Sequence, residues 1–157
     1  MNKGFTLIEI LMYSALTTFM LTFAILSTYQ LIDGSARNKY QKELVENQKT
    51  LEQKIYWALQ SVSAINAPAA GATSTTLSID KIGFAQNPVV IDLNSGVVRL
   101  KRGSGAAQPI TNEFSEIQDL SFHQHVFDGR PAIQVRATVY NYYASTSVEI
   151  DTTILTR

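Results

Sequence analysis

The sequence predicts an α+β fold in which one long N-terminal helix packs on an antiparallel β-sheet head. Three patterns along the 157 residues support this prediction. Apolar residues run almost unbroken from residue 5 to residue 32, and an apolar stripe with helical spacing then continues to residue 66. From residue 74 onward the apolar positions alternate with a period of two, which is typical of strands with one buried face. A helix and a sheet of this kind stabilise each other by burying their apolar faces together.

Residues 5–32 are predicted to form a transmembrane helix. The run has about 28 residues and as a helix would be roughly 42 Å long, which exceeds the ~20 residues that cross a bilayer core. Glu9 is the only carboxylate in it, and a carboxylate in lipid is costly enough to mark a functional site. The run is about twice too long for a secretory signal peptide, whose apolar part has ~7–15 residues. An ordinary signal anchor stays open as an alternative, because Lys3 suits a cytoplasmic N-terminus.

Residues 33–66 are predicted to continue as an amphipathic helix. Apolar side chains recur at spacings of three, four or seven and form one stripe, made by Tyr40, Leu44, Leu51, Ile55, Leu59 and Val62. Lysine and glutamate residues of mixed sign lie between them and are expected to face solvent. The helix is expected to end at Ala67-Pro68, because a proline disfavours helical geometry in the residue before it. Residues 69–75 then form a loop.

The remaining residues, 74–157, are predicted to be rich in β-strand. Asn94-Ser95-Gly96, between two β-branched runs, is typical of a hairpin turn, and Asp128-Gly129 indicates a second one. Apolar and polar residues alternate near the C-terminus, as expected for an antiparallel sheet with one buried face. The expected strands are residues 76–79, 89–93, 97–101, 117–126, 132–143 and 147–155.

Composition excludes several classes of function. The chain has 13 basic and 13 acidic residues and no strongly basic segment, so nucleic acid is not an expected partner. Arg99, Lys101 and Arg102 form one small basic cluster, which is interpreted as a solvated strand end. The chain has no cysteine, so neither disulfides nor thiolate metal sites are available to it. No phosphate loop, catalytic serine motif or cofactor motif is found, and we expect neither an enzyme nor a bound cofactor.

Two groups of side chains on the expected strands are weaker candidates. His123 and His125 are two residues apart, so both would point to one face of a strand, a geometry that suits a metal. No third ligand is indicated, and the two are interpreted as surface histidines with no metal site. Tyr140, Tyr142 and Tyr143 are interpreted as a sheet face or rim, and a role in adhesion or in subunit contacts is left open.

The contiguous sequence Lys3-Gly4-Phe5-Thr6-Leu7-Ile8-Glu9 resembles the class III signal of type IV prepilins and pseudopilins. The resemblance implies that residues 1–4 are a leader, that a prepilin peptidase cuts between Gly4 and Phe5, and that Phe5 becomes an N-methylated terminus. It also implies that Glu9 pairs with the Phe5 amine of a neighbouring subunit. That pairing would set the register of helices that could otherwise slide past one another. Residues 5–32 would then be the filament-core helix and residues 33–157 the head.

The head resembles those of minor pilins and minor pseudopilins, although less specifically. Residues 12–32 contain no proline or glycine, unlike many major pilins, which favours a minor subunit. The resemblance implies a single-pass protein of the bacterial inner membrane with its head outside, later extracted into a filament by assembly platform proteins. Its partners would be other pilin or pseudopilin subunits and the prepilin peptidase/methyltransferase. The filament could be a type IV pilus, a type II secretion pseudopilus or a DNA-uptake pilus. Two alternatives stay open, a membrane-anchored binding module and a filament-borne adhesin or DNA receptor.

Overall fold

The protein has one long helix and two antiparallel sheets. The computed structural model describes residues 6–112, 115–143 and 145–156. The chain forms two compact units, residues 1–39 and residues 40–157, and helix α1 (Leu7–Ala58, 52 residues) begins in the first and ends in the second. Within the second unit, which we call the head, the last part of α1 packs on the sheets. The predicted α+β class is therefore confirmed.

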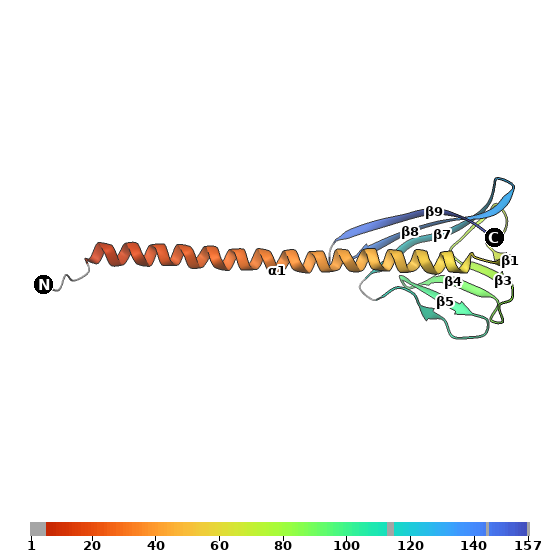
Figure 1. Cartoon of the computed structure of the whole chain (residues 1–157), viewed down its shortest axis with the longest axis horizontal. Coiled ribbons are helices and arrows are strands. Elements are labelled where there is room, and N and C mark those ends of the chain that lie inside the picture. The colour runs from red at the N-terminus through yellow and green to blue at the C-terminus, as the bar shows by residue number, and fades with distance from the viewer. Residues whose placement is uncertain (1–5, 113–114, 144, 157) are drawn as a thin grey trace. The chain divides into compact units, whose positions relative to one another are not determined.

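The strands of the head form two sheets, with every neighbouring pair antiparallel (Figure 1). The first sheet has the order β1-β3-β4-β5-β6 and comprises β1 (Val62–Ala67), β3 (Leu77–Lys81), β4 (Val89–Asn94), β5 (Val97–Arg102) and β6 (Gln108–Pro109). The second has the order β2-β7-β8-β9 and comprises β2 (Thr73–Ser74), β7 (Glu116–Phe127), β8 (Arg130–Asn141) and β9 (Thr146–Leu155). The six predicted strands correspond to β3, β4, β5, β7, β8 and β9.

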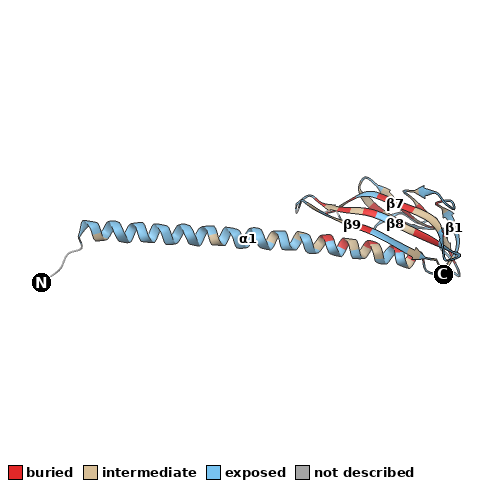
Figure 2. Ribbon diagram, turned by 90° about the horizontal axis from the view of Figure 1, so that it is seen from above, coloured by how far each residue is buried: buried red, intermediate tan, exposed pale blue. Residues whose placement is uncertain are grey.

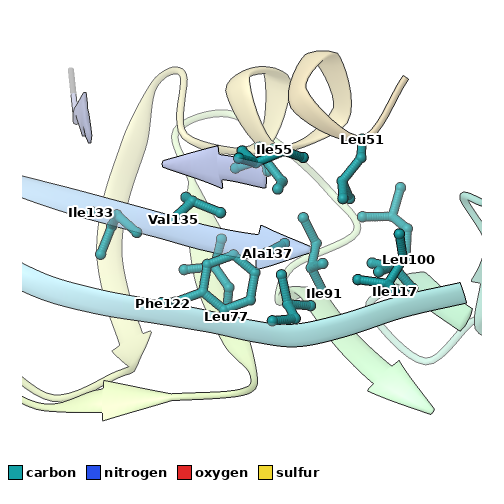
Figure 3. Packing of buried hydrophobic residues seen from close by; sticks show 14 of the residues in the cluster. Leu51, Ile55, Leu77, Ile91, Leu100, Ile117, Phe122, Ile133, Val135 and Ala137 are labelled. Carbon is teal, nitrogen blue, oxygen red and sulfur yellow. The ribbon is translucent and has the colours of Figure 1, made fainter. Parts of the chain in front are cut away.

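One hydrophobic core joins α1 to both sheets. The buried positions of α1 lie in its second half, where Leu51 and Ile55 are almost completely shielded from solvent (Figure 2). They face Leu77 and Ile91 of the first sheet and Phe122 of the second, all of which are fully buried (Figure 3). Each fully buried side chain of this size stabilises the head by about 1.5–3 kcal/mol relative to its exposed state. The predicted apolar stripe of the helix is thus the element that holds the two sheets together.

The prediction that the helix continues to residue 66 is wrong. Helix α1 ends at Ala58, and the residues that follow form strand β1 at the edge of the first sheet. Ser61 turns the chain with a φ of 57°, in the left-handed region that ends helices. Lys81 of β3 then donates hydrogen bonds to the carbonyl oxygens of the last two helical residues, Trp57 and Ala58, and to that of Gln60 just after the helix. The predicted loop at residues 69–75 also contains a short strand, β2.

Candidate functional site

The apolar segment of α1 presents its side chains outward along its whole length. Residues 7–32 are exposed except for Glu9 and Ser27, which are partly buried. Leu7, Phe19 and Ile32 are between 64% and 79% exposed, which is unusual for large apolar side chains in water. By length and composition, α1 is long and apolar enough to cross a membrane. The length and apolar character of α1 are therefore compatible with a single-pass membrane anchor.

Four hydroxyl groups of the apolar segment donate hydrogen bonds to carbonyl oxygens of the helix itself. The Thr18 hydroxyl donates to the carbonyl oxygen of Ser14 at 2.8 Å, and the Thr22 hydroxyl donates to that of Thr18 at 2.9 Å. Ser14 and Thr28 bond in the same way to the carbonyls of Leu11 and Ala24, each at 2.9 Å. A polar group in hydrocarbon must find an internal partner because no water is present. These bonds lower the cost of placing the four hydroxyl groups in lipid.

Glu9 lies in the first turn of α1, three residues after Thr6, which caps the start of the helix. The backbone nitrogen of Glu9 donates to the carbonyl oxygen of Thr6 at 3.1 Å and lies 3.4 Å from the Thr6 hydroxyl oxygen. Thr6 and Glu9 therefore have the spacing of a capping box, in which a threonine side chain accepts from the backbone N–H three residues later. A carboxylate in the first turn is also favoured by the helix dipole. Gly4 and Phe5, the expected cleavage site, lie outside the described residues.

A buried asparagine, which was not among the residues predicted to be functional, connects the helix to the loop before β7. Asn47 is 6% exposed and lies on the apolar stripe between Leu44 and Leu51. Its Nδ2 donates to Asn112 Oδ1 at 2.7 Å and to Ser115 Oγ at 2.9 Å, and its Oδ1 accepts from the Asn112 backbone nitrogen at 3.4 Å. The signal in the sequence was a single polar residue at a position where the stripe requires an apolar one.

An apolar cleft of about 340 Å³ lies in the head between the end of α1 and strands β8 and β9. Tyr56 and Trp57 form its helical wall, and Ile150 and Ile154 lie on the opposite wall. Its lining is mostly apolar, as in small-molecule sites, but it contains few polar groups that would orient a ligand. The cleft therefore offers apolar contact area, but its lining does not indicate which ligand it would bind.

His123 and His125 share one face of β7, as the sequence predicted. Their rings stack with centroids 5.7 Å apart, and Nδ1 of His123 lies 3.1 Å from the Thr73 hydroxyl of β2. In the described part of the chain no group of three or more histidine or carboxylate side chains is arranged to hold a metal. Asp119 and Asp128, the nearest carboxylates in the sequence, both adopt positive φ values at a bulge and a turn.

Two residues of the small basic cluster on β5, Arg99 and Arg102, contact different partners. Arg99 binds Asp92 of the neighbouring strand through two hydrogen bonds of 3.0 and 2.7 Å, which raise the pKa of its guanidinium. Arg102 instead lies over the Trp57 ring, with 5.0 Å between its Cζ and the ring centroid. This separation agrees with the interpretation of the cluster as a strand end.

Four tyrosines form two ring pairs at the β8–β9 turn, which we call together the tyrosine cluster: Tyr40, Tyr140, Tyr142 and Tyr143. The Tyr143 ring stacks on Tyr40 of α1 with centroids 5.0 Å apart, and Tyr140 meets Tyr142 edge to face at the same distance. The Tyr142 hydroxyl donates to Glu116, and this bond raises the pKa of the phenol. The stacking places the turn between β8 and β9 beside the residue at which α1 joins the head.

Comparison with protein-family models, curated proteins and solved structures finds no match to this chain. The features of this chain that bear on its function are therefore the N-terminal motif, the apolar helix and the geometry of the head.

Proposed function

We propose that this chain is a minor pilin or minor pseudopilin, a structural subunit of a type IV pilus, a type II secretion pseudopilus or a DNA-uptake pilus. The observation that carries the proposal is the continuity of the motif from Gly4 to Glu9 with the apolar helix that follows it. A plain membrane anchor needs the helix alone. It gives no reason for Gly4-Phe5 at the start or for a carboxylate in the first turn.

The physical role of the motif follows from burial of charge. A carboxylate surrounded by apolar helices is costly unless a charged partner pairs with it. After cleavage, the Phe5 amine of a neighbouring subunit is such a partner and stays cationic when methylated. Because only one offset between two helices brings the amine and Glu9 together, the pair selects one register. Two uniformly apolar helices without such a pair could pack at several different offsets.

The proposed life of the molecule has two stages. It first stays in the bacterial inner membrane with its head outside, held by residues 5–32. Assembly platform proteins then move it into a filament, where the same helix packs against those of other subunits. The lack of proline and glycine in residues 12–32 supports a minor subunit that helps initiate the filament.

The direct test is the N-terminus of the protein isolated from its native host. Intact-mass measurement is expected to show a chain that begins at Phe5 and carries one added methyl group. A Gly4→Leu variant should accumulate as the longer precursor, because a side chain at this position hinders the close approach of the backbone to the peptidase. A chain that keeps Met1 in an otherwise active host would contradict the proposal.

The cleft beside Tyr56 and Trp57 favours one alternative, a membrane-anchored binding module. That function requires no cleavage, so the same mass measurement separates the two. The other alternative, a filament-borne adhesin or DNA receptor, predicts salt-dependent DNA binding by the full chain. Absence of such binding would remove the DNA receptor.

A further inference from the structure

The tyrosine cluster exposes aromatic surface at one end of the head. Tyr142 is 62% exposed and Tyr143 is 64% exposed, and they are adjacent in the turn between β8 and β9. Exposed aromatic side chains gathered in this way mark an interaction surface. The polar end of Tyr142 is held by Glu116, so the flank of the ring is the part left for contact.

The chain itself limits how far this surface is from the apolar segment. Tyr40, on which Tyr143 stacks, follows Ile32 by eight residues in the sequence. Even fully extended, these residues span at most about 28 Å. The tyrosine cluster is therefore close along the chain to the end of the apolar segment. Tyrosine is enriched where hydrocarbon meets water, because its ring is apolar and its hydroxyl is polar.

The opposite end of the head provides a comparison. Strand β8 has 12 residues and separates the β8–β9 turn from the β7–β8 turn, a distance of about 36 Å along the strand. The end of β7 beside the β7–β8 turn also exposes apolar side chains, Val126 at 70% and Phe127 at 57%. Exposure alone does not distinguish the two turns. Only the first is close along the chain to the apolar segment.

We propose that the tyrosine cluster rests on the bilayer surface at headgroup depth while the protein is anchored in the membrane. This inference depends on the membrane-anchored stage of the proposed function. Contact of Tyr142 and Tyr143 with the bilayer fixes the orientation of the head before the subunit leaves the membrane. Movement into a filament then has to break this contact.

The absence of cysteine allows single cysteines to be labelled without background. The full chain is reconstituted in phosphatidylethanolamine/phosphatidylglycerol vesicles, with a fluorophore on Ser147→Cys, Val126→Cys or Phe19→Cys. Ser147 is exposed and pairs with Tyr140 across β8 and β9, so its label reports on the tyrosine cluster. Lipids carrying nitroxides on the headgroup or deep in the acyl chain are then added as quenchers.

Headgroup nitroxides are expected to quench the label at position 147 several-fold more than the label at position 126. A Tyr142→Ser/Tyr143→Ser double variant should reduce quenching at position 147 to the level at 126, with circular dichroism confirming that the head stays folded. Deep nitroxides should quench the label at position 19. This third label reports on the anchor independently of the head.

Equal and weak quenching at positions 147 and 126, with strong quenching at 19, would overturn the inference and leave the anchor intact. A label at position 19 that deep nitroxides do not quench would instead contradict the anchor itself. If position 147 becomes shielded only in assembled filaments, the tyrosine cluster is a subunit contact and the membrane proposal fails.

Discussion

The Lys81 amino nitrogen lies 4.6 Å from the centroid of the Trp57 ring and 2.5 Å from the carbonyl oxygen of the same residue. It also donates to the carbonyl oxygens of Ala58 at 3.2 Å and Gln60 at 2.5 Å. The last carbonyls of a helix have no partner within the helix, and a cation beside them is favoured by the helix dipole. Burial lowers the pKa of Lys81, which shows that this position opposes the charged form. Lys81 therefore connects β3 to the end of α1.

Replacing Lys81 with methionine is expected to destabilise the head. The variant keeps an unbranched apolar chain but removes the donor to the buried carbonyl group of Ala58, and an unsatisfied buried polar group costs about 1–3 kcal/mol. Thermal unfolding followed by circular dichroism should show a melting temperature lower by several degrees. Lys101→Met is the matched control, because Lys101 is exposed on β5 of the same sheet. Equal melting temperatures for the two variants would show that the cap contributes nothing.

The end of α1 shows why part of the fold was not predictable. Val62 and Ile65 are three residues apart, a spacing that indicates a helix when it follows a helical stripe. In the structure they belong to β1, whose pairing with β3 shifts register between Val62 and Ala64. A β-bulge adds one residue to a strand, so the inward positions of β1 are three apart instead of two. A bulged strand and a helix turn therefore give the same local pattern.

Strand β7 contains a second irregularity of this kind. Strict alternation from Ile117 would place Asp119 inside and Leu120 outside. A register shift between Gln118 and Ser121, with Asp119 at a φ of 54°, reverses this arrangement and leaves Leu120 1% exposed. The strand itself was predictable, because the alternation of its residues is interrupted at only one place, the register shift at Asp119. The phase of its second half depends on packing against α1, which no local pattern contains.

Asn47 offers a second test of the head. Replacing it with leucine removes the donor to Asn112 and to the buried hydroxyl of Ser115, at an expected cost of about 1–3 kcal/mol. The loss should appear as a lower melting temperature, together with faster amide hydrogen exchange at Thr111 and Asn112. Lys49→Leu is the control, because it makes the same side chain at an exposed position of the same helix. Unchanged exchange in Asn47→Leu would mean that the loop is held by other contacts.

The pair formed by Asp151 and Arg136 predicts a dependence of stability on acid pH. Asp151 accepts from Gln134 at 2.8 Å and from Arg136 at 3.1 Å, and these bonds hold the pKa of its carboxyl below 3.8. On acidification the unfolded chain takes up this proton first. The stabilisation is therefore present at pH values above the ordinary range of an aspartate pKa and is lost as the pH falls through the lower pKa of the folded state.

An Asp151→Asn variant should consequently lose less stability than the unmodified chain between pH 5 and pH 2, as judged from urea unfolding at each pH. Glu149→Gln removes a carboxylate from an exposed position on the same strand without breaking an ion pair described in the structure. Its pH profile should remain closer to that of the unmodified chain. Parallel profiles for all three proteins would show that Asp151 contributes no acid sensitivity.

The most direct prediction about assembly separates two roles for Glu9. If its charge pairs with the Phe5 amine of a neighbour, Glu9→Gln and Glu9→Ala should both insert and be cleaved normally but enter filaments several-fold less efficiently. A capping role would instead depend on Thr6, whose hydroxyl lies 3.4 Å from the Glu9 nitrogen. Thr6→Val removes that oxygen and keeps the carboxylate, and Glu9 still donates to the Thr6 carbonyl at 3.1 Å.

Thr6→Val is therefore expected to assemble almost normally. The measurement is the ratio of subunit in sheared filaments to subunit in the membrane, with the processed size checked for each variant. Normal assembly of Glu9→Gln together with failure of Thr6→Val would assign the motif to helix capping. The charge would then have no part in register. Failure of Glu9→Gln alone supports pairing, because the amide keeps the shape and one hydrogen-bonding oxygen of the side chain but removes its charge and replaces the second oxygen with an NH2 group.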